Sequence, residues 1–191
     1  MYCVKCGQSM SRRTPDGDSR ERDVCEGCGF IHYENPRSVV GTVPLLGERI
    51  ILCRRAIAPR RGYWTLPAGF LETGETTEEG AARETREEAG VDVQVGELFS
   101  VVNVVHVHHV YLFYLGIAQS HRLVPGIESL DARIVSASEV PWDEIAFPAV
   151  TYTLKRFFAD RDAGRIASGQ FRFIRPACRR RSSSDASTCH A

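Results

Sequence analysis

Residues 69–91 read GFLETGETTEEGAARETREEAGV, and seven of these 23 residues are glutamates. Thr76 and Glu79 have the spacing of a capping box, and Gly90 stands where a left-handed C-terminal cap is needed. Most residues between the two ends are good helix formers. We therefore predict one strongly acidic helix over residues 76–89.

Glu84, Glu87 and Glu88 fall on one face of this helix, because residues three and four positions apart are neighbours. Two carboxylates about 5.5 Å apart repel by about 3 kcal/mol at an effective dielectric near 20. A divalent cation reverses the sign of that interaction. Oxygen donors without Cys or His nearby favour Mg²⁺ or Mn²⁺. The alternative is a solvated acidic helix with ion pairs spaced i,i+4.

The segment before the helix, WTLPAGF at 64–70, predicts a tight turn that leads directly into the acids. Gly69 can bring its backbone carbonyl close to a metal, which bulkier residues resist. Arg83 lies four residues before Glu87, and Glu75 lies just before the helix. Either acid can pair with Arg83 and hold it in place beside the metal ligands.

The same stretch resembles the Nudix box, GX5EX7REUXEEXGU, where U is a bulky apolar residue. The matching residues are Gly69, Glu75, Arg83, Glu84, Glu87, Glu88, Gly90 and Val91, and Thr85 departs at the first U position. The resemblance implies an α/β/α sandwich with a mixed sheet. It also implies Mg²⁺-dependent hydrolysis of a nucleoside diphosphate linked to another moiety. Glu84, Glu87 and Glu88 would bind the metal, with the Gly69 carbonyl as a further candidate ligand.

Two CxxC pairs stand at the amino end, Cys3/Cys6 and Cys25/Cys28, separated by 18 residues. This spacing is typical of a zinc site. Four thiolates make a closed tetrahedral site, which is structural rather than catalytic. The alternatives are two disulfides or four unrelated thiols, but disulfides need an oxidising compartment and no export signal is apparent. We predict a Zn²⁺ ribbon over residues 1–33.

The length of 191 residues allows one ordinary domain and a small appendage. We predict the ribbon at 1–33, a Nudix domain at 34–175 and a disordered polar tail at 176–191. The formal net charge of zero gives no electrostatic case for nucleic acid or membrane as the main partner. No apolar run reaches transmembrane length, and the cysteine usage suits the cytoplasm. A homodimer is compatible with the resemblance.

The rest of the chain predicts strands and a second helix. Apolar runs at 38–46 and 49–54 flank Gly47-Glu48 and indicate a hairpin. Further strands are expected at 91–95, 98–105, 109–118 and 133–135, and a helix at 148–163 with Pro in its first turn. This mixture supports a sheet with helices on its faces.

Several residues outside the acidic helix are candidates for contact with substrate. Glu128, in a late loop, is the candidate general base beside Glu88. Arg54 and Arg55 close a strand and can touch phosphate. Phe70 can stack on a base. His106, His108 and His109 form a metal site, a substrate-facing pair at 106 and 108, or a solvated strand end.

Two resemblances reduce the number of candidate substrates. A zinc ribbon before a Nudix box is similar to the NADH pyrophosphatases, but their SQPWPFPXS element is missing, and PGIESL stands at 125–130. The ribbon, AIAPRRGYW at 56–64, LPAGF at 66–70 and PGIES at 125–129 look more like ribbon-bearing Nudix proteins allied to the plant ADP-ribose/FAD pyrophosphatases. We expect a dinucleotide-type substrate, ADP-ribose or FAD, cleaved to release AMP. The alternatives are NAD(H) cleavage, removal of NAD caps from RNA, or a non-enzymatic nucleotide-sensing or RNA-binding module.

Overall fold

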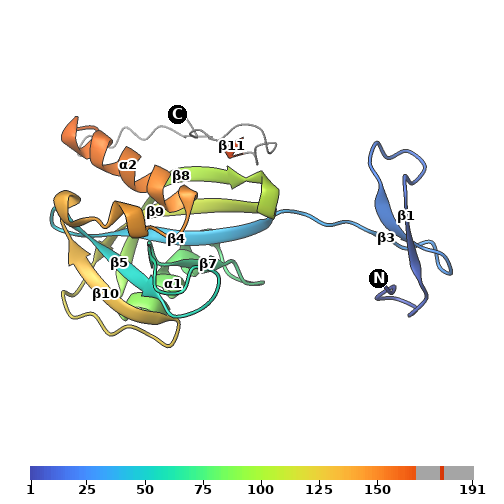
Figure 1. The fold of residues 1–191 in the computed structure, drawn as a ribbon, viewed down its shortest axis with the longest axis horizontal. Coiled ribbons are helices and arrows are strands. Elements are labelled where there is room, and N and C mark those ends of the chain that lie inside the picture. Colours follow the sequence, from blue (N-terminus) through green and yellow to red (C-terminus); the bar gives the residue numbers. More distant parts are fainter. Residues whose placement is uncertain (167–176, 179–191) are drawn as a thin grey trace. The chain divides into compact units, whose positions relative to one another are not determined.

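The computed structural model describes residues 1–166 and 177–178. The chain divides into two compact units, Met1–Pro36 and Arg37–Ala191 (Figure 1). The predicted boundaries at 33 and 175 stay predictions. The tail predicted at 176–191 lies outside the described residues, apart from 177–178. No helix of the described part is long and apolar enough to span a membrane.

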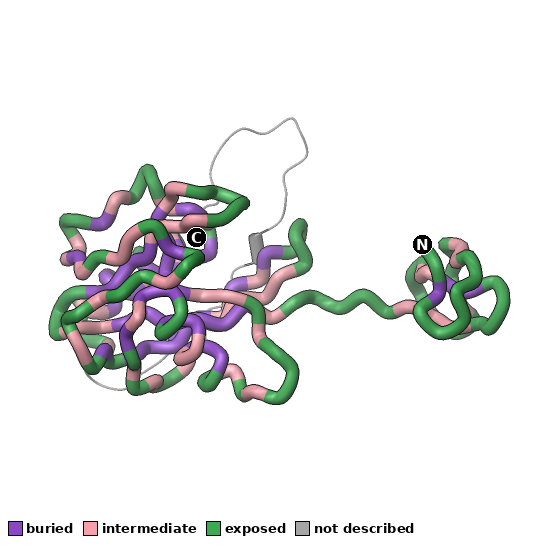
Figure 2. Tube along the Cα trace, turned by 90° about the horizontal axis from the view of Figure 1, so that it is seen from below, coloured by how far each residue is buried: buried purple, intermediate pink, exposed green. Residues whose placement is uncertain are grey.

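The first unit is a small antiparallel sheet with strand order β1 (Met10–Arg13), β2 (Arg22–Cys25) and β3 (Ile31–His32). Its buried apolar side chains are Cys3, Val24 and Cys25. Figure 2 shows how short the buried stretches of this unit are. Because so small a core cannot offset the entropy of folding, the unit needs a further support.

The second unit is built on an eight-stranded mixed sheet with the order β10-β5-β4-β9-β8-β11, in which β6 pairs with β5 and β7 with β4. Strand β4 runs parallel to β9 and forms the predicted hairpin with β5. The strands are β4 (Arg37–Leu46), β5 (Arg49–Arg55), β6 (Trp64–Thr65), β7 (Ala68–Phe70), β8 (Val93–Val104), β9 (His109–Ala118), β10 (Ser129–Val135) and β11 (Ala177–Cys178).

Helices α1 (Thr77–Ala89) and α2 (Pro148–Asp162) cover opposite faces of this sheet. Successive side chains of β5 point to opposite faces of the sheet, as in any pleated strand. Ile50 and Leu52 belong to the same buried cluster as Leu154 of α2, whereas Ile51 packs with Ala89 of α1. The predicted α/β/α sandwich is therefore confirmed (Figure 1).

Both ends of α1 match their predicted signals. The Thr76 hydroxyl accepts a hydrogen bond from the Glu79 amide at 3.2 Å, and the Glu79 carboxylate accepts one from the Thr76 amide at 2.7 Å. Gly90 closes the helix at φ 67°, a left-handed conformation that favours glycine. The capping box and the glycine cap together set the length of the acidic helix.

Thr85, where the chain departs from the apolar pattern, is fully buried. Its hydroxyl donates to the Ala81 carbonyl at 2.8 Å and lies 2.7 Å from the hydroxyl of Thr42 on β4. Since the Thr85 proton goes to Ala81, the Thr42 hydroxyl donates to Thr85. The departure is thus met by a hydrogen bond between helix and sheet.

Two predicted strands differ in the structure. Segments 91–95 and 98–105 form the single strand β8, which has register irregularities between Val95 and Ser100. The chain leaves this strand at Val104 and turns through a 3-10 helix, Val105–Val107. Two further 3-10 helices, Ala137–Glu139 and Trp142–Glu144, lead into α2.

Replacing Thr76 by alanine removes the side-chain acceptor at the start of α1. We expect Thr76→Ala to lower the free energy of unfolding by about 1 kcal/mol, the usual worth of such a cap. Chemical denaturation measures the change. Thr76→Ser keeps the hydroxyl and should stay close to wild type; equal loss in both variants would contradict the capping role.

Candidate functional site

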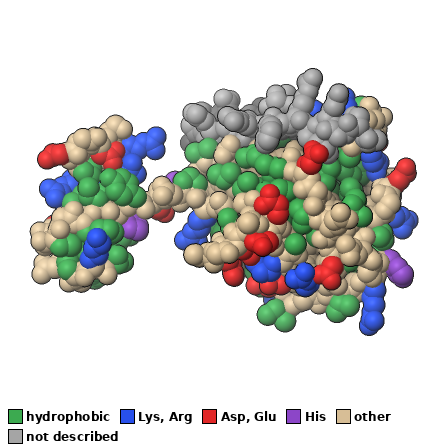
Figure 3. Space-filling view, turned by 180° about the vertical axis from the view of Figure 1, so that it is seen from behind, with side chains coloured by type: hydrophobic (Ala, Val, Ile, Leu, Met, Phe, Trp, Pro, Cys, Tyr) green, Lys and Arg blue, Asp and Glu red, His purple; other side chains and the backbone are tan. Residues whose placement is uncertain are grey.

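A cavity of about 650 Å³ opens on the second unit beside α1. Residues of β4, β5, β7, α1, β9 and the loops that precede β6 and β10 line it. Its charged lining residues are Arg55, Glu72, Arg83, Glu84, Glu87, Glu88 and Glu128, and its aromatic ones are Phe70, His109, Tyr111 and Phe147. Figure 3 shows acidic and basic side chains interspersed on one face of the second unit. The cavity therefore combines a charged part with an aromatic part.

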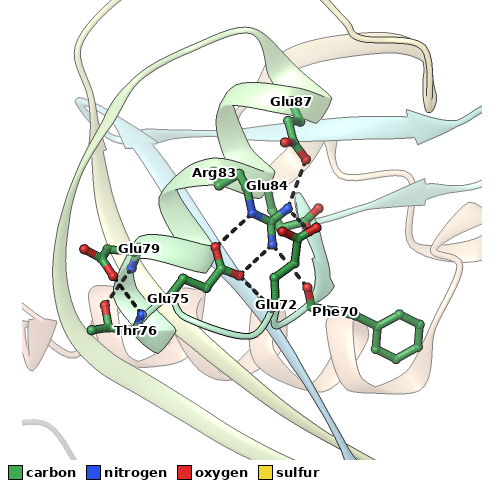
Figure 4. Close-up of polar contacts among 8 residues, drawn as sticks. All are labelled: Phe70, Glu72, Glu75, Thr76, Glu79, Arg83, Glu84 and Glu87. Atoms are coloured by element: carbon green, nitrogen blue, oxygen red, sulfur yellow. Dashed lines mark hydrogen bonds and ion pairs between the residues drawn. The ribbon is translucent and has the colours of Figure 1, made fainter.

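Arg83 is the centre of the charged part (Figure 4). Its guanidinium donates to both oxygens of Glu75, at 3.0 and 2.8 Å, and to the Phe70 carbonyl at 3.1 Å. The same group donates to Glu84 at 2.6 Å and to Glu87 at 3.0 Å. Glu75 and Glu87 were alternative partners in the sequence analysis, and the structure pairs Arg83 with both.

This pairing sets the charge of Glu75. The Arg83 guanidinium lowers the pKa of Glu75 to about 2, and the carboxylates raise the pKa of Arg83 in return. The Glu75 carboxylate also accepts a hydrogen bond from the Glu72 amide at 2.8 Å. Glu75 is thus held ionised and links the loop before α1 to the arginine on the helix.

Glu84 and Glu88 are the buried acids, 9% and 5% exposed, whereas the Glu87 side chain is 58% exposed. Burial raises the pKa of Glu84 even beside Arg83. Burial, with the charge of Glu84, raises the pKa of Glu88 to about 8. The Ala68 amide donates to Glu88 at 3.3 Å. Burying two carboxyl groups so close together disfavours their charged forms. A divalent cation bound between them would stabilise the charged forms.

Gly69 lies against the Glu84 carboxylate so closely that a methyl group on its Cα would overlap the carboxylate. A side chain at residue 69 would therefore push the Glu84 carboxylate away from its place beside β7. The contact brings the β7 backbone at Gly69 next to the buried acid Glu84. Hard oxygen donors from Gly69, Glu84 and Glu88 fit Mg²⁺ or Mn²⁺ in kind.

The carboxylates are not gathered as tightly as a filled site would require. Among the described residues, the four amino-terminal cysteines are the group whose donor atoms converge within 4.8 Å of one another. The Arg83 guanidinium stands between Glu84 and Glu87, donating to both from one nitrogen. A cation bound by both acids would either use their other carboxylate oxygens or displace this nitrogen from one of them.

Glu128 reaches the cavity through close backbone packing on the end of α1. A methyl group at Gly126 would overlap the Glu87 carbonyl, and the Val124 amide donates to the Ala89 carbonyl at 3.0 Å. The Glu128 carbonyl accepts from the Ala56 amide at 2.8 Å. These contacts place an exposed carboxylate on the same cavity as the helix acids.

The structure separates the two adjacent arginines. Arg55 lines the cavity, where its guanidinium lies 5.0 Å from the centre of the Phe147 ring and donates to the Pro59 carbonyl at 2.9 Å. Arg54 is not among the lining residues and donates to the Gly62 carbonyl at 2.8 Å. Arg55 is therefore placed to meet a ligand, while Arg54 holds the 56–62 loop.

Of the arrangements expected of the histidine cluster, the solvated strand end is confirmed for His106 and His108. His106 and His108 are exposed in and after the 3-10 turn, and His108 has φ 56°. The substrate-facing pair at 106 and 108 was wrong, because the strand ends at Val104 and its alternation stops there. His109, the first residue of β9, lines the cavity instead. Side chains alternate along a strand, so His109 and Tyr111 share a face of β9. This alternation is the sequence signal that would have placed His109 in the cavity.

The amino-terminal cysteines form a second site, in the first unit. The Cys3 and Cys28 sulfurs are 3.7 Å apart, and those of Cys6 and Cys25 are 3.4 Å apart. Tetrahedral Zn–S bonds place sulfurs about 3.8 Å apart, whereas a disulfide needs about 2.05 Å. The Cys28 amide, followed by that of Gly27, lowers the pKa of Cys25 to about 6. Free thiols at this spacing fit zinc and do not form the two disulfides of the alternative.

The fold and cavity define a class: an α/β/α protein whose acidic helix lines a pocket suited to a cation and a phosphorylated ligand. The chain belongs to the NUDIX hydrolase family, since the model described as NUDIX domain matches residues 35–160. A second model, described as Nudix N-terminal, is a zinc-ribbon family and matches residues 1–34. The family resemblance of the acidic stretch is thereby confirmed.

Individual relatives agree with this assignment. A crystal structure of a NUDIX hydrolase from Nitrosomonas europaea is 41% identical, with a TM-score of 0.86 over 93% of this chain and 99% of that one. The NAD-capped RNA hydrolase NudC of Stutzerimonas stutzeri is 30% identical over 84% of this chain and 56% of its own. An ADP-ribose pyrophosphatase of Methanocaldococcus jannaschii is 38% identical over 36% of this chain and 41% of its own. The chain spans about half the length of the first curated relatives that it matches.

Purified protein should contain one zinc ion per chain, measured by atomic emission. Cys25→Ser should abolish the zinc, since four thiolates are needed to close the site. The first unit should then lose its amide-exchange protection, because its apolar core is small. Cys53→Ala removes a buried cysteine outside the set and should leave the zinc content unchanged. Zinc retained in Cys25→Ser would contradict the four-thiolate site.

The raised pKa of Glu88 predicts how the metal-free protein responds to pH. The folded state favours the neutral form of Glu88. Protonation of Glu88 therefore contributes its full stabilisation below the ordinary pKa of 4.5, and this stabilisation is lost as pH rises through about 8. The melting temperature should fall over that window, and Glu88→Gln should flatten the fall. Glu97→Gln, an exposed change outside the cavity, should keep the wild-type slope. An unchanged slope in Glu88→Gln would contradict the assignment.

Proposed function

We propose that this protein hydrolyses the pyrophosphate bond of a nucleoside diphosphate derivative, with ADP-ribose or FAD preferred, and releases AMP. One observation carries the proposal: a single cavity joins the acids of α1 to an aromatic wall. A volume of about 650 Å³ lies within the range that holds a whole small-molecule ligand. A diphosphate suits the acidic part once a cation is bound, and a base suits the aromatic part.

In this proposal, Glu84, Glu87, Glu88 and the Gly69 carbonyl hold Mg²⁺ or Mn²⁺. The metal would neutralise the diphosphate and acidify a water molecule. Arg83 and Glu75 keep the helix acids in position. Support comes from the burial of Glu84 and Glu88 and from the close approach of Gly69 to Glu84.

The remaining residues act on the substrate. Arg55, turned to the cavity by Pro59 and Phe147, binds a phosphate oxygen. Glu128, exposed on the cavity and outside the helix, takes the proton of the attacking water, and Glu88 is the alternative base. Phe70, 46% exposed at the cavity, stacks on a ring of the substrate. Arg54 is not carried into the proposal, because it is not among the residues that line the cavity.

Hydrolysis of NAD caps on RNA is the second candidate. The NudC relative, a NAD-capped RNA hydrolase, matches 84% of this chain, which favours it. The expectation that nucleic acid is an unlikely partner is therefore weakened. A cytoplasmic location and a homodimer stay predictions.

The test is AMP release, measured with Mg²⁺ and a panel of ADP-ribose, FAD, NADH, a diadenosine polyphosphate and NAD-capped RNA. We expect the highest kcat/KM on ADP-ribose or FAD. Glu84→Gln and Glu88→Gln should each lower kcat by about 100-fold or more, and Glu97→Gln should match wild type.

Turnover on capped RNA alone would favour the second candidate. Full activity in Glu88→Gln would remove that residue from the reaction. Tight binding of a nucleotide without any turnover would support a sensing module instead of an enzyme.

A further inference from the structure

His109 lies where the sheet opens onto the aromatic part of the cavity. It is the first residue of β9 and pairs in register with Arg37 of β4. Tyr111, two residues further, is on the same face of β9 because side chains alternate along a strand. Both residues line the cavity. The imidazole is therefore part of the wall that would face the substrate.

Two aromatic rings flank the imidazole. Its centroid lies 5.2 Å from that of Phe70, edge to face at 84°, and 6.1 Å from that of Tyr111, tilted at 60°. Phe70 comes from β7, which also carries Gly69, and Tyr111 comes from β9. His109 thus joins the two sides of the aromatic wall.

The imidazole has an unmet hydrogen-bonding need. Its Nδ1 atom is buried and has no hydrogen-bond partner among the described residues. Buried polar atoms in native proteins are nearly always paired, and an unpaired one costs stability. A phenylalanine would fill the same place among the rings without that cost. The imidazole therefore serves something other than packing.

The charge state of His109 indicates which kind of ligand group the imidazole can bind. Burial, followed by the charges of Arg37 and His108, holds the pKa of His109 below its usual range. At pH 7 the ring is neutral, with one N–H donor and one acceptor nitrogen. A neutral imidazole suits the polar edge of an uncharged ring better than it suits a phosphate.

We propose that His109 is a specificity-determining residue that hydrogen-bonds the uncharged base of the substrate in a subsite walled by Phe70 and Tyr111. This inference rests on the proposed function, because it assigns one part of the same substrate. The enclosed Nδ1 reaches the ligand when the imidazole turns about its Cβ–Cγ bond.

The test compares two substrates and three variants. ADP-ribose carries a base, whereas a diphosphate that joins two riboses does not. His109→Phe should raise KM for ADP-ribose about tenfold, the worth of one hydrogen bond, with kcat within about twofold. Hydrolysis of the base-free substrate should not change. His109→Asn keeps a hydrogen-bonding side chain and should recover part of the loss. His106→Phe, a matched change in the exposed turn, should behave as wild type on both substrates.

Melting of the metal-free protein separates this role from a structural one. His109→Phe removes an unpaired buried nitrogen and should raise the melting temperature. A lowered melting temperature would show that the imidazole has a partner within the fold and would overturn the proposal. An equal loss on both substrates, or no change on either, would overturn it as well.

Calorimetric titration with ADP-ribose distinguishes failure here from failure of the proposed function. Binding that is weakened about tenfold in His109→Phe, with no AMP released by wild type, supports the base subsite and contradicts the hydrolase. Turnover by wild type that is indifferent to His109→Phe contradicts the subsite alone.

Discussion

One guanidinium holds the charged part of this cavity together. Arg83 donates to Glu75, Glu84, Glu87 and the Phe70 carbonyl, so every polar nitrogen of its side chain has a partner. Without this cation, three carboxylates from one helix and its preceding loop would repel one another. The arginine therefore allows the acidic helix to fold against the sheet before any metal binds.

The same network couples the loop to the helix. Glu75 and the Phe70 carbonyl belong to the segment that contains Gly69, whereas Glu84 and Glu87 belong to α1. A change in the partners of Arg83 would therefore move both the loop carbonyl and the helix acids. A metal held by Glu84 or Glu87 would share these carboxylates with Arg83, so metal binding and the position of the Phe70 carbonyl are linked through one side chain.

Local signals made the helix, its caps and the cysteine site predictable. A capping box, a terminal glycine and the spacing of CxxC pairs each act within a few residues, so tertiary structure does not change their meaning. The positions that failed depend on where a strand ends. Arg54 and Arg55 are equivalent until the register of β5 is known, and His106 lost its expected face when the chain turned after Val104. Glu128 could be proposed but not placed, because its position follows from packing at Gly126.

The central claim is that the acids of α1 and the Gly69 carbonyl form one cation site. A crystal of the protein soaked in Mn²⁺, with anomalous diffraction measured near the manganese edge, tests it most directly. The account predicts an anomalous peak bounded by Glu84, Glu88 and the Gly69 carbonyl. Full Arg83 contacts to Glu84 and Glu87, with no peak beside them at saturating Mn²⁺, would contradict it.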